Sequence, residues 1–432
     1  MLDQEFLRRK KKIAMEKWYN SFSIRDSLTC CELTDATVLP LHKDADTALQ
    51  FGRGGVVCDG KYIQESGIEG RVGGYYEYSD EAFCDQKVVY CGALIRQWGH
   101  FLVESVSRLW YFLQNDPTVD RYVFISNRSH FQSKKEITGN YRAFFELLGV
   151  WDKIEVITVP TRFREVLIPE LGYSRKYYYS KEYKELFETV AENAVKQCHH
   201  LTQEEKVFLS RSRFPKASSN EFGLNMLDNY FEKNHFKILY PEALPLHEMI
   251  WYLRHAEVCA AESGTVPHNY LFCQDEKDCI IIERQATINE IQANIDIIKD
   301  LKVSYIDGFY MVYPTLAGYG PYILGYNDLF SAFSENFGYR PPDKQFLSEK
   351  NLRNNLRKYF RAYKKAYGYH WGFEKWQLMY GDAYYEAYED SCKVLGPYLS
   401  REKALFWTDY FDTHILKAAI KALLHRIKSI NS

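Results

Sequence analysis

Long apolar runs are missing from this sequence of 432 residues. No stretch approaches the roughly 18 apolar residues that a transmembrane helix needs, so we expect no membrane span. A basic cluster (RRKKK) occupies residues 8–12, but no apolar segment follows it, and we therefore expect no secretory signal. These absences favour a cytoplasmic protein.

Paired cysteines and a strong net charge are missing as well. The ten cysteines form no CxxC pair and no zinc-binding spacing, and several lie in apolar runs such as VVYCG and DCIII. We expect reduced and mostly buried thiols. The net charge of −2 argues against a nucleic-acid-binding protein.

The basic residues that are present cluster toward the C-terminus. Residues 350–376 hold eight Lys or Arg and one Glu, and residues 414–430 form an amphipathic pattern without any acid. Such a helix packs on the protein through its apolar face or lies on an anionic membrane, and the pattern allows both. The second alternative predicts a peripheral position at the inner face of the membrane.

Apolar, strand-like runs alternate with helical patterns between residues 85 and 310. Four of these runs are VVYCGALI (88–95), RYVFIS (121–126), VFLSR (207–211) and EVCAAE (257–262). Apolar strands separated by helices predict parallel sheets with both faces covered, and the length suggests two domains. We predict an α/β protein with an N-terminal domain over residues 1–195, a second domain over 200–325 and a helical region over 326–432.

The run WGHFLVESVSRLW (98–110) is predicted to form one helix directly after a strand. On a helix His100, Glu104 and Arg108 share one stripe, because they are four residues apart. An imidazole at the carboxyl end of a strand is suited to accept a proton, and Glu104 can orient it or act as the base itself. The alternative is a buried ion cluster that only positions helices.

Two further strands end in polar residues. LSRSR (209–213) places Ser210, Arg211 and Arg213 at a strand end, where arginine side chains can bind a diphosphate. A solvated loop is the alternative interpretation. The run IIIER places Glu283 at another strand end, where a carboxylate can hold sugar hydroxyls or pair with a neighbouring base.

The segment AAESGTVPHN combines a strand end at Glu262 with a predicted helix start near Thr265. Gly264 allows a tight turn, and the free N–H groups of the helix together with the hydroxyls of Ser263 and Thr265 can form an anion site. The alternative is an ordinary capped helix in which His268 is a core residue.

Taken in order, these motifs resemble the family 61 glycosyltransferases, especially their bacterial branch in capsular polysaccharide biosynthesis. The resemblance covers about residues 85–300, and its most specific parts are GHFLVESVSRLW and NYLFC (269–273). It implies a GT-B architecture, in which two Rossmann-like domains face a cleft. It also implies an inverting transfer from a nucleotide sugar, with a UDP-sugar as the expected donor, and no bound metal or other cofactor.

The resemblance also assigns roles by position. His100 becomes the base and Glu104 its acidic partner, while Arg108 holds Glu104 or the acceptor. Arg211 matches the arginine that meets the leaving diphosphate. The predicted donor-binding residues are Ser210, Arg213, Glu262, Ser263, Gly264, Thr265, His268, Asn269 and Glu283.

One segment departs from the family pattern. Gly264 and Asn269 match the Gly and Asn of the family segment H-G-A-G-L-T-N, but the family His falls on Ser263 and the second Gly on Val266. His268 or the neighbouring hydroxyls are the alternatives for contacting the donor phosphate.

Two other functions stay open because of this departure. One is a catalytically inert sugar-binding or scaffold protein of a polysaccharide assembly system, and the other is a nucleotide-sugar epimerase or hydrolase of the same architecture. The leading prediction names a nucleotide-sugar donor and a glycan or lipid-linked glycan acceptor as partners, and no nucleic acid.

Overall fold

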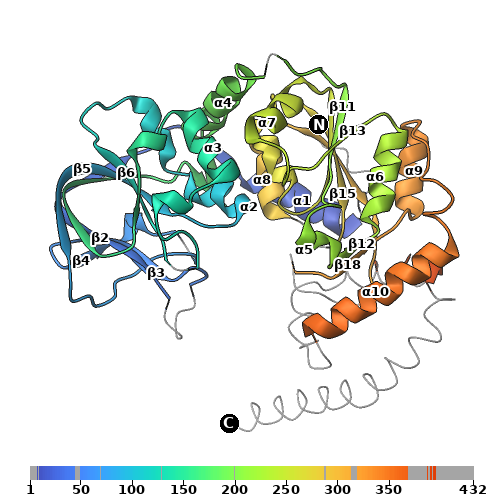
Figure 1. The fold of residues 1–432 in the computed structure, drawn as a ribbon, viewed down its shortest axis with the longest axis horizontal. Helices are drawn as coiled ribbons and strands as arrows, with labels where there is room; N and C mark the ends of the chain where they lie inside the picture. Colours follow the sequence, from blue (N-terminus) through green and yellow to red (C-terminus); the bar gives the residue numbers. More distant parts are fainter. Residues whose placement is uncertain are drawn as a thin grey trace, which may run out of the picture.

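A computed structural model describes most of the chain. The described residues are 7, 9–43, 49–68, 70–127, 129–198, 200–286, 289–312, 319–367, 387, 390–391 and 393–395. They form a mixed α/β structure with two lobes side by side, each built around its own sheet (Figure 1). The predicted C-terminal helix over residues 414–430 lies outside the described residues. The nine cysteines within them are free, and five are buried.

The first lobe contains a seven-stranded sheet in the order β4-β3-β2-β8-β5-β6-β7. Its strands are β2 (Cys30–His42), β3 (Arg53–Cys58), β4 (Lys61–Ile63), β5 (Ala82–Ala93), β6 (Arg121–Ile125), β7 (Ile154–Ile157) and β8 (Thr161–Pro169). Only β8, β5, β6 and β7 are parallel to one another, whereas β2, β3 and β4 are antiparallel. The prediction of parallel strands between residues 85 and 310 therefore agrees with β5 to β8. The antiparallel strands β2, β3 and β4 come from residues 30–63, outside the range of that prediction.

A two-residue hairpin explains part of the antiparallel arrangement. Cys58 pairs with Lys61, so Asp59 and Gly60 alone connect β3 to β4. Both connecting residues have positive φ, at 50° and 69°, which is the conformation that an Asp-Gly hairpin turn requires. The Asp-Gly turn therefore favours the antiparallel pairing of β3 with β4 locally, independently of the other strands of the sheet.

The second lobe contains a five-stranded, fully parallel sheet in the order β13-β11-β14-β15-β16. Its strands are β11 (Lys206–Leu209), β13 (Lys237–Leu239), β14 (Val258–Glu262), β15 (Asp278–Glu283) and β16 (Lys302–Asp307). One face packs against α7 (Leu246–His255) and α8 (Glu290–Ile298), and the other against α6 (Leu224–Lys233) and α9 (Asp328–Asn336). This three-layer arrangement agrees with the predicted α/β pattern.

Smaller elements complete the described residues. β1 (Ser23–Arg25), β10 (Tyr178–Ser180) and β9 (Tyr173–Ser174) form one small sheet, and β12 (Glu221–Phe222), β18 (Tyr322–Leu324) and β17 (Phe309–Tyr310) form another. The remaining helices are α5 (Pro215–Ser218), α10 (Glu349–Tyr367) and the short turns η1 (Gln64–Ser66), η4 (Lys134–Glu136) and η5 (Trp151–Lys153). α10 packs along β12 and β18 at the outer edge of the second lobe (Figure 1).

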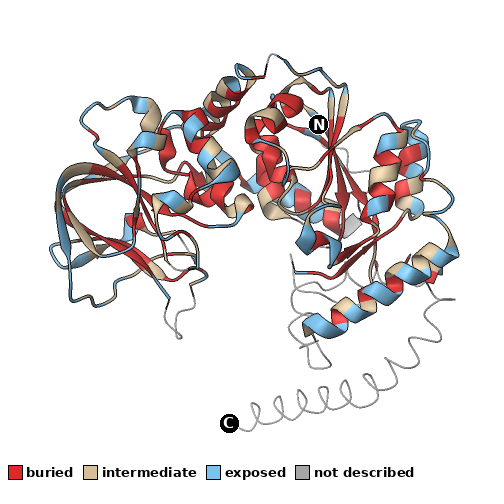
Figure 2. Cartoon of the chain, viewed as in Figure 1, coloured by how far each residue is buried: buried red, intermediate tan, exposed pale blue. Residues whose placement is uncertain are grey.

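The two lobes share one hydrophobic core. Helix α3 (Gly139–Leu148) lies between β6 and β7 in the chain, helix α4 (Lys181–Val195) follows β8, and α4 packs against α7 of the second lobe. The ring of Phe187 lies 5.9 Å from that of Phe144 and 5.3 Å from that of Phe272, so an aromatic chain crosses the joint. Figure 2 shows buried residues running through this joint without a break.

The first helix, α1 (Arg9–Ser21), packs against the second lobe, although the predicted N-terminal domain spans residues 1–195. Lys11 is buried and contacts Glu283 and Asp307 at the ends of β15 and β16. Trp18 and Tyr19 donate hydrogen bonds to side chains of α8. Helix α1 therefore belongs to the second lobe, and the chain passes from it to the first lobe through β1.

The predicted single helix over residues 97–114 is wrong. The segment consists of one α-turn, α2 (Trp98–His100), a π-helical turn, η2 (Phe101–Ser105), and a 3-10 helix, η3 (Leu109–Gln114). Ser105 Oγ accepts a hydrogen bond from the backbone N–H of Ile95, and Ser107 Oγ accepts one from that of Tyr173. Both side chains therefore bond to segments outside the predicted helix, and the helix is irregular where these bonds form.

Candidate active site

His100 and Glu104 form a hydrogen-bonded pair at the start of the irregular helix. His100 Nδ1 lies 2.9 Å from Glu104 Oε2, and the two side chains are 13% and 8% exposed. Glu104 is close enough to hold the imidazole with its proton on Nδ1, which leaves the lone pair of Nε2 available. The pair can therefore accept a proton at Nε2.

Arg108 does not join this pair, because the π-turn rotates it away from the stripe that a regular helix would give. Its side chain is buried and donates to the backbone carbonyls of Pro169, Glu65 and Gly67 at 2.9, 2.6 and 3.1 Å. The predicted contact with Glu104 is thus wrong, and a side chain 1% exposed cannot reach an acceptor. Arg71 contacts Glu104 instead, with 3.3 Å between Nε and Oε1.

The start of this segment lies directly against the second lobe. Trp98 Nε1 donates a 2.8 Å hydrogen bond to Asn269 Oδ1. A Cβ atom added at Gly99 would lie 2.8 Å from Thr265 Cγ2 and 2.9 Å from His268 Nδ1, so only glycine permits this approach. The structure thus brings the GHFLVE motif and the segment after β14 together, although more than 160 residues separate them.

His268 lies at this contact and is 3% exposed. Burial, together with the nearby His100 ring, lowers the pKa of His268 to about 3, so the ring is neutral at physiological pH. Asn289 lies near enough to oppose this shift, but neither ring nitrogen makes a hydrogen bond of normal geometry among the described residues. A neutral, unpaired imidazole beside His100 can donate to or accept from a polar group.

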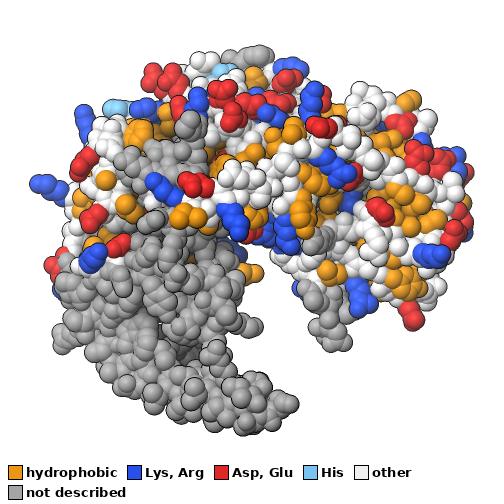
Figure 3. Space-filling model, turned by 180° about the vertical axis from the view of Figure 1, so that it is seen from behind, with side chains coloured by type: hydrophobic (Ala, Val, Ile, Leu, Met, Phe, Trp, Pro, Cys, Tyr) orange, Lys and Arg blue, Asp and Glu red, His pale blue; other side chains and the backbone are white. Residues whose placement is uncertain are grey.

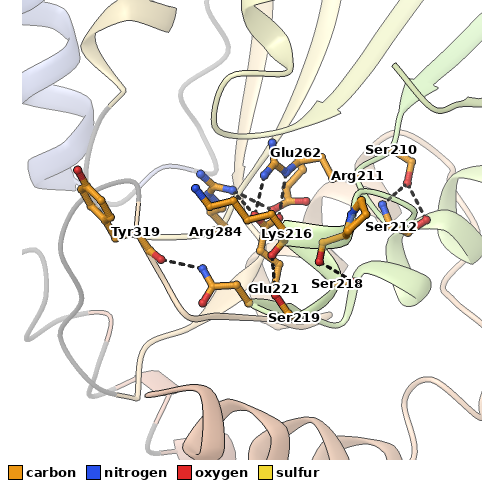
Figure 4. A network of polar contacts seen from close by, with 12 residues as sticks. Ser210, Arg211, Ser212, Lys216, Ser218, Ser219, Glu221, Glu262, Arg284 and Tyr319 are labelled. Carbon is orange, nitrogen blue, oxygen red and sulfur yellow. Dashed lines mark hydrogen bonds and ion pairs between the residues drawn. The ribbon is translucent and has the colours of Figure 1, made fainter. Parts of the chain in front are cut away.

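A second polar cluster lies at the carboxyl ends of β11, β14 and β15. Arg211 makes two hydrogen bonds to Glu221, at 3.0 and 2.8 Å, and Arg284 makes a third at 2.8 Å. Glu262 forms an ion pair with Arg284, with 3.7 Å between Glu262 Oε1 and Arg284 Nη1. Figure 4 shows the two arginines and two glutamates pointing toward one another. We call these four residues the Arg–Glu network.

The two carboxyl groups of the network titrate in opposite directions. Burial disfavours the charge on Glu221, but Arg284 and Arg211 outweigh it and hold its pKa below the usual range. Burial and the charge of Glu221 raise the pKa of Glu262 well above its ordinary value. These shifts favour the neutral form of Glu262 and the ionised form of Glu221, so two guanidinium groups face one favoured carboxylate. This balance of charge suits an anionic ligand.

Gly264 makes the network possible. Its φ is +132°, and a Cβ atom there would lie 2.8 Å from Arg284 Nη2. The predicted tight turn is therefore present, and it lets the Arg284 guanidinium pass close to the backbone. The predicted helix near Thr265 is instead a six-residue 3-10 helix, η6 (Pro267–Phe272), which is too short to supply the expected helix N-terminus.

The remaining predicted donor-binding residues are dispersed. Ser210 hydrogen-bonds to Asp228, and Arg213 is exposed with its guanidinium 3.8 Å from the centre of the Tyr240 ring. Ser263 Oγ accepts from the backbone N–H of Arg284 at 3.3 Å. Glu283 is buried and paired with Lys11, so its carboxylate is not directed at a ligand hydroxyl.

Several residues of the site escaped the sequence analysis. Phe51 and Arg71 reach the His100–Glu104 pair from a glycine-rich segment, and Glu221 comes from a two-residue strand. None of them lies in a motif that spacing could identify. Arg284 comes directly after the strand end at Glu283, and this position could have identified it as a candidate site residue.

The described residues contain no group of three or more His, Cys, Asp and Glu side chains arranged to hold a metal ion. Among the helices formed by these residues, none is both long and apolar enough to cross a membrane.

Comparison with known protein families supports a family 61 glycosyltransferase. The family model described as Glycosyltransferase 61 matches residues 98–281. The match begins two residues before His100 and ends within β15, so it covers the His100–Glu104 pair and the strand ends that carry Arg211 and Glu262. No curated protein matches the chain.

Proposed function

We propose that this protein transfers a sugar from a nucleotide sugar to a hydroxyl group of a glycan, with inversion at the anomeric carbon. The observation that carries the proposal is the contact between the lobes: the His100–Glu104 pair lies against the segment that follows β14. A proton acceptor of one lobe thereby adjoins the strand ends of the other, and parallel α/β sheets bind ligands at those ends.

The proposed reaction gives separate roles to the His100–Glu104 pair and to the group that meets the diphosphate. The acceptor oxygen attacks the anomeric carbon while the bond from that carbon to the diphosphate oxygen breaks. Nε2 of His100 takes the hydroxyl proton, and the electron pair of the broken bond leaves with the diphosphate. Glu104 keeps the other ring nitrogen protonated.

The Arg–Glu network is the proposed partner of the leaving diphosphate. Its balance of charge sets Arg211 and Arg284 against the single favoured carboxylate of Glu221. Fixed charges of this kind stabilise a developing anion without reorganisation, and the proposed reaction therefore needs no metal. Figure 3 shows several Lys and Arg side chains gathered near the middle of this face of the molecule.

The test is nucleotide release from UDP-, GDP-, CMP- and dTDP-sugars, each with and without EDTA and with oligosaccharide acceptors. We expect one nucleotide class, with UDP-sugars first, to be consumed equally in both conditions. His100→Ala should lower the rate by about 10²–10⁴-fold, the usual contribution of a general base.

His235→Asn is the matched control. His235 is exposed, precedes β13 at the opposite end of the sheet and has a φ of 65°, which Asn tolerates. Donor consumption that is unchanged in His100→Ala would overturn the assignment of the base. Binding of a nucleotide sugar without any consumption would favour the inert sugar-binding alternative.

We also propose that the protein works at the inner face of a membrane on a lipid-linked glycan in surface polysaccharide assembly. Helix α10 supports this, because its apolar residues Leu356 and Tyr359 are packed inward. Its exposed cations Lys358, Arg361 and Lys365 lie within about 60° of one another at 100° per residue. Since the apolar face is already occupied, contact with lipid is electrostatic rather than insertive.

Vesicle sedimentation tests the membrane contact. The protein should sediment with phosphatidylcholine vesicles only when they contain phosphatidylglycerol, and added salt should release it. The triple variant Lys358→Glu, Arg361→Glu, Lys365→Glu should lose this binding. The control changes three exposed lysines elsewhere to Glu: Lys61, Lys135 and Lys196. An equal loss of vesicle binding in both triple variants would show that binding depends on net charge alone and not on helix α10.

A further inference from the structure

Two glycine-rich segments of the first lobe, GRGG (52–55) and RVGG (71–74), lie side by side. The N–H of Phe51 donates to the carbonyl of Arg71 at 2.9 Å, and the N–H of Gly54 donates to that of Gly74 at 3.2 Å. At Gly52, φ is 107° and an added Cβ would lie 2.4 Å from the carbonyl oxygen of His42, so the close approach of this segment to the end of β2 requires glycine there. We call this pair of segments the glycine ribbon.

The glycine ribbon brings two side chains to the His100–Glu104 pair. The ring of Phe51 meets that of His100 edge to face, with centroids 5.4 Å apart and an angle of 81°. Arg71 Nε lies 3.3 Å from Glu104 Oε1, while the other carboxylate oxygen is 2.9 Å from His100 Nδ1. Each oxygen of Glu104 therefore has its own partner.

Two more titratable groups face His100. Burial, Arg96, His100 and Lys43 lower the pKa of His130, and burial and His100 lower that of His268 to about 3. Both rings are therefore neutral at pH 7. The charged groups in this set of contacts are therefore Glu104, which contacts His100, and Arg71, which contacts Glu104.

We propose that Arg71 is a positioning residue, which acts through Glu104 to fix the orientation, the tautomer and the proton affinity of His100. It neutralises the carboxylate and holds its second oxygen, so that the first stays aligned with Nδ1. The catalytic meaning of this arrangement rests on the proposed function. The arrangement itself can be measured in the free protein.

Removal of Arg71 should move the titration of His100 in a defined direction. In Arg71→Ala the carboxylate loses its neutralising partner, so it should stabilise the protonated His100 ring and keep it protonated to higher pH. Glu104→Gln should do the opposite, because the anion is gone. Arg71→Lys retains the positive charge and should titrate nearly like the unsubstituted protein. A role limited to loop packing would not give two shifts of opposite sign.

The experiment is an NMR titration of the protein labelled in its histidine rings, with the His100 signal assigned by its loss in His100→Gln. The nitrogen shifts should show the proton on Nδ1 in the unsubstituted protein and in Arg71→Lys. They should show a mixture of tautomers in Glu104→Gln. Arg53→Ala is the matched control, since Arg53 lies in the same ribbon but donates to the carbonyl of Tyr75.

Activity supplies the second readout. The acid limb of the pH–rate profile for nucleotide release should move to higher pH in Arg71→Ala, with a rate about tenfold lower near neutral pH. A His100 titration that is unchanged in Arg71→Ala, or shifted equally in Arg53→Ala, would overturn the proposal. If the titration shifts as expected but no nucleotide sugar is consumed, the positioning role stands and the proposed function fails.

Discussion

At the scale of single residues, two buried polar side chains of the candidate site lack full hydrogen bonding. Both nitrogens of His268 and both carboxyl oxygens of Glu262 are without a hydrogen bond of normal geometry among the described residues. Unpaired groups of this kind cost stability, and proteins often retain them where they have a function. These two positions are therefore informative for single substitutions.

His268 predicts a specific loss of stability in acid. Its pKa is about 3 in the folded protein and near 6.5 when unfolded, so the unfolded chain binds the extra proton. The full contribution is present above pH 6.5 and is lost as the pH falls toward 3, by up to about 1.4 kcal/mol per pH unit. Urea unfolding between pH 7 and 4 measures this slope.

The variant His268→Gln should flatten that dependence, because glutamine does not titrate. His235→Asn, which alters an exposed histidine, should leave the slope unchanged. Equal slopes in His268→Gln and in the unsubstituted protein would show that other groups cause the acid sensitivity.

The sequence predicted part of the site at this scale. The spacing of His100 and Glu104 predicted a contact, and the structure has it, because one helical turn still brings these residues, four apart, together although Glu104 lies in the π-turn. Arg108 was misplaced, since a single π-turn changes the direction of every later side chain. Contacts such as Arg71 with Glu104 depend on chain packing that no local spacing encodes.

At the scale of elements, α1 is held to the second lobe by a buried cation. Lys11 lies between Glu283 and Asp307, 3.3 and 3.1 Å from their oxygens, and all three side chains are almost fully buried. Burial opposes the charge on Lys11, but the two carboxylates outweigh it and raise its pKa. The ion cluster thus holds α1 against the second lobe, and its lysine also pairs with the carboxylate of Glu283.

Removal of this cation should be costly. Lys11→Met leaves two buried carboxylates facing each other and should lower the free energy of unfolding by about 3–5 kcal/mol. Chemical denaturation measures the change. Lys17→Met, at an exposed position of the same helix, should change it by less than about 0.5 kcal/mol.

A second substitution separates the charge effect from loss of packing. Asp307→Asn added to Lys11→Met removes one of the two repelling charges and should recover part of the loss. No recovery would mean that the aliphatic stem of Lys11, rather than its charge, holds α1 in place.

Elements with strong local patterns were predictable, and elements shaped by distant contacts were not. Strands β11 (Lys206–Leu209) and β14 (Val258–Glu262) lie close to the predicted runs 207–211 and 257–262, because an apolar run indicates a buried strand directly. Strand β16 of the same sheet was not predicted. The Asp-Gly hairpin between β3 and β4 was detectable in principle from its dipeptide. The irregular segment from Trp98 to Gln114 was not, because Ser105 and Ser107 bond to partners that are distant in the sequence.

At the scale of the whole molecule, two lobes were predictable from length and pattern, but their connection was not. The hydrophobic core that runs through α3, α4 and α7 joins the sheets into one body. The proposed reaction site lies at this joint, where Gly99 touches the segment after β14. Any motion that separates the lobes would therefore have to repack aromatic side chains.

The placement of α1 also orders events during synthesis. Lys11 leaves the ribosome before its partner Asp307, which lies 296 residues further along the chain. At about 5–20 residues per second, roughly 15–60 s pass between the synthesis of α1 and that of its binding site. During that interval α1 presents a positively charged and partly apolar surface to whatever the nascent chain meets, and the second lobe can close only after β16 has been made.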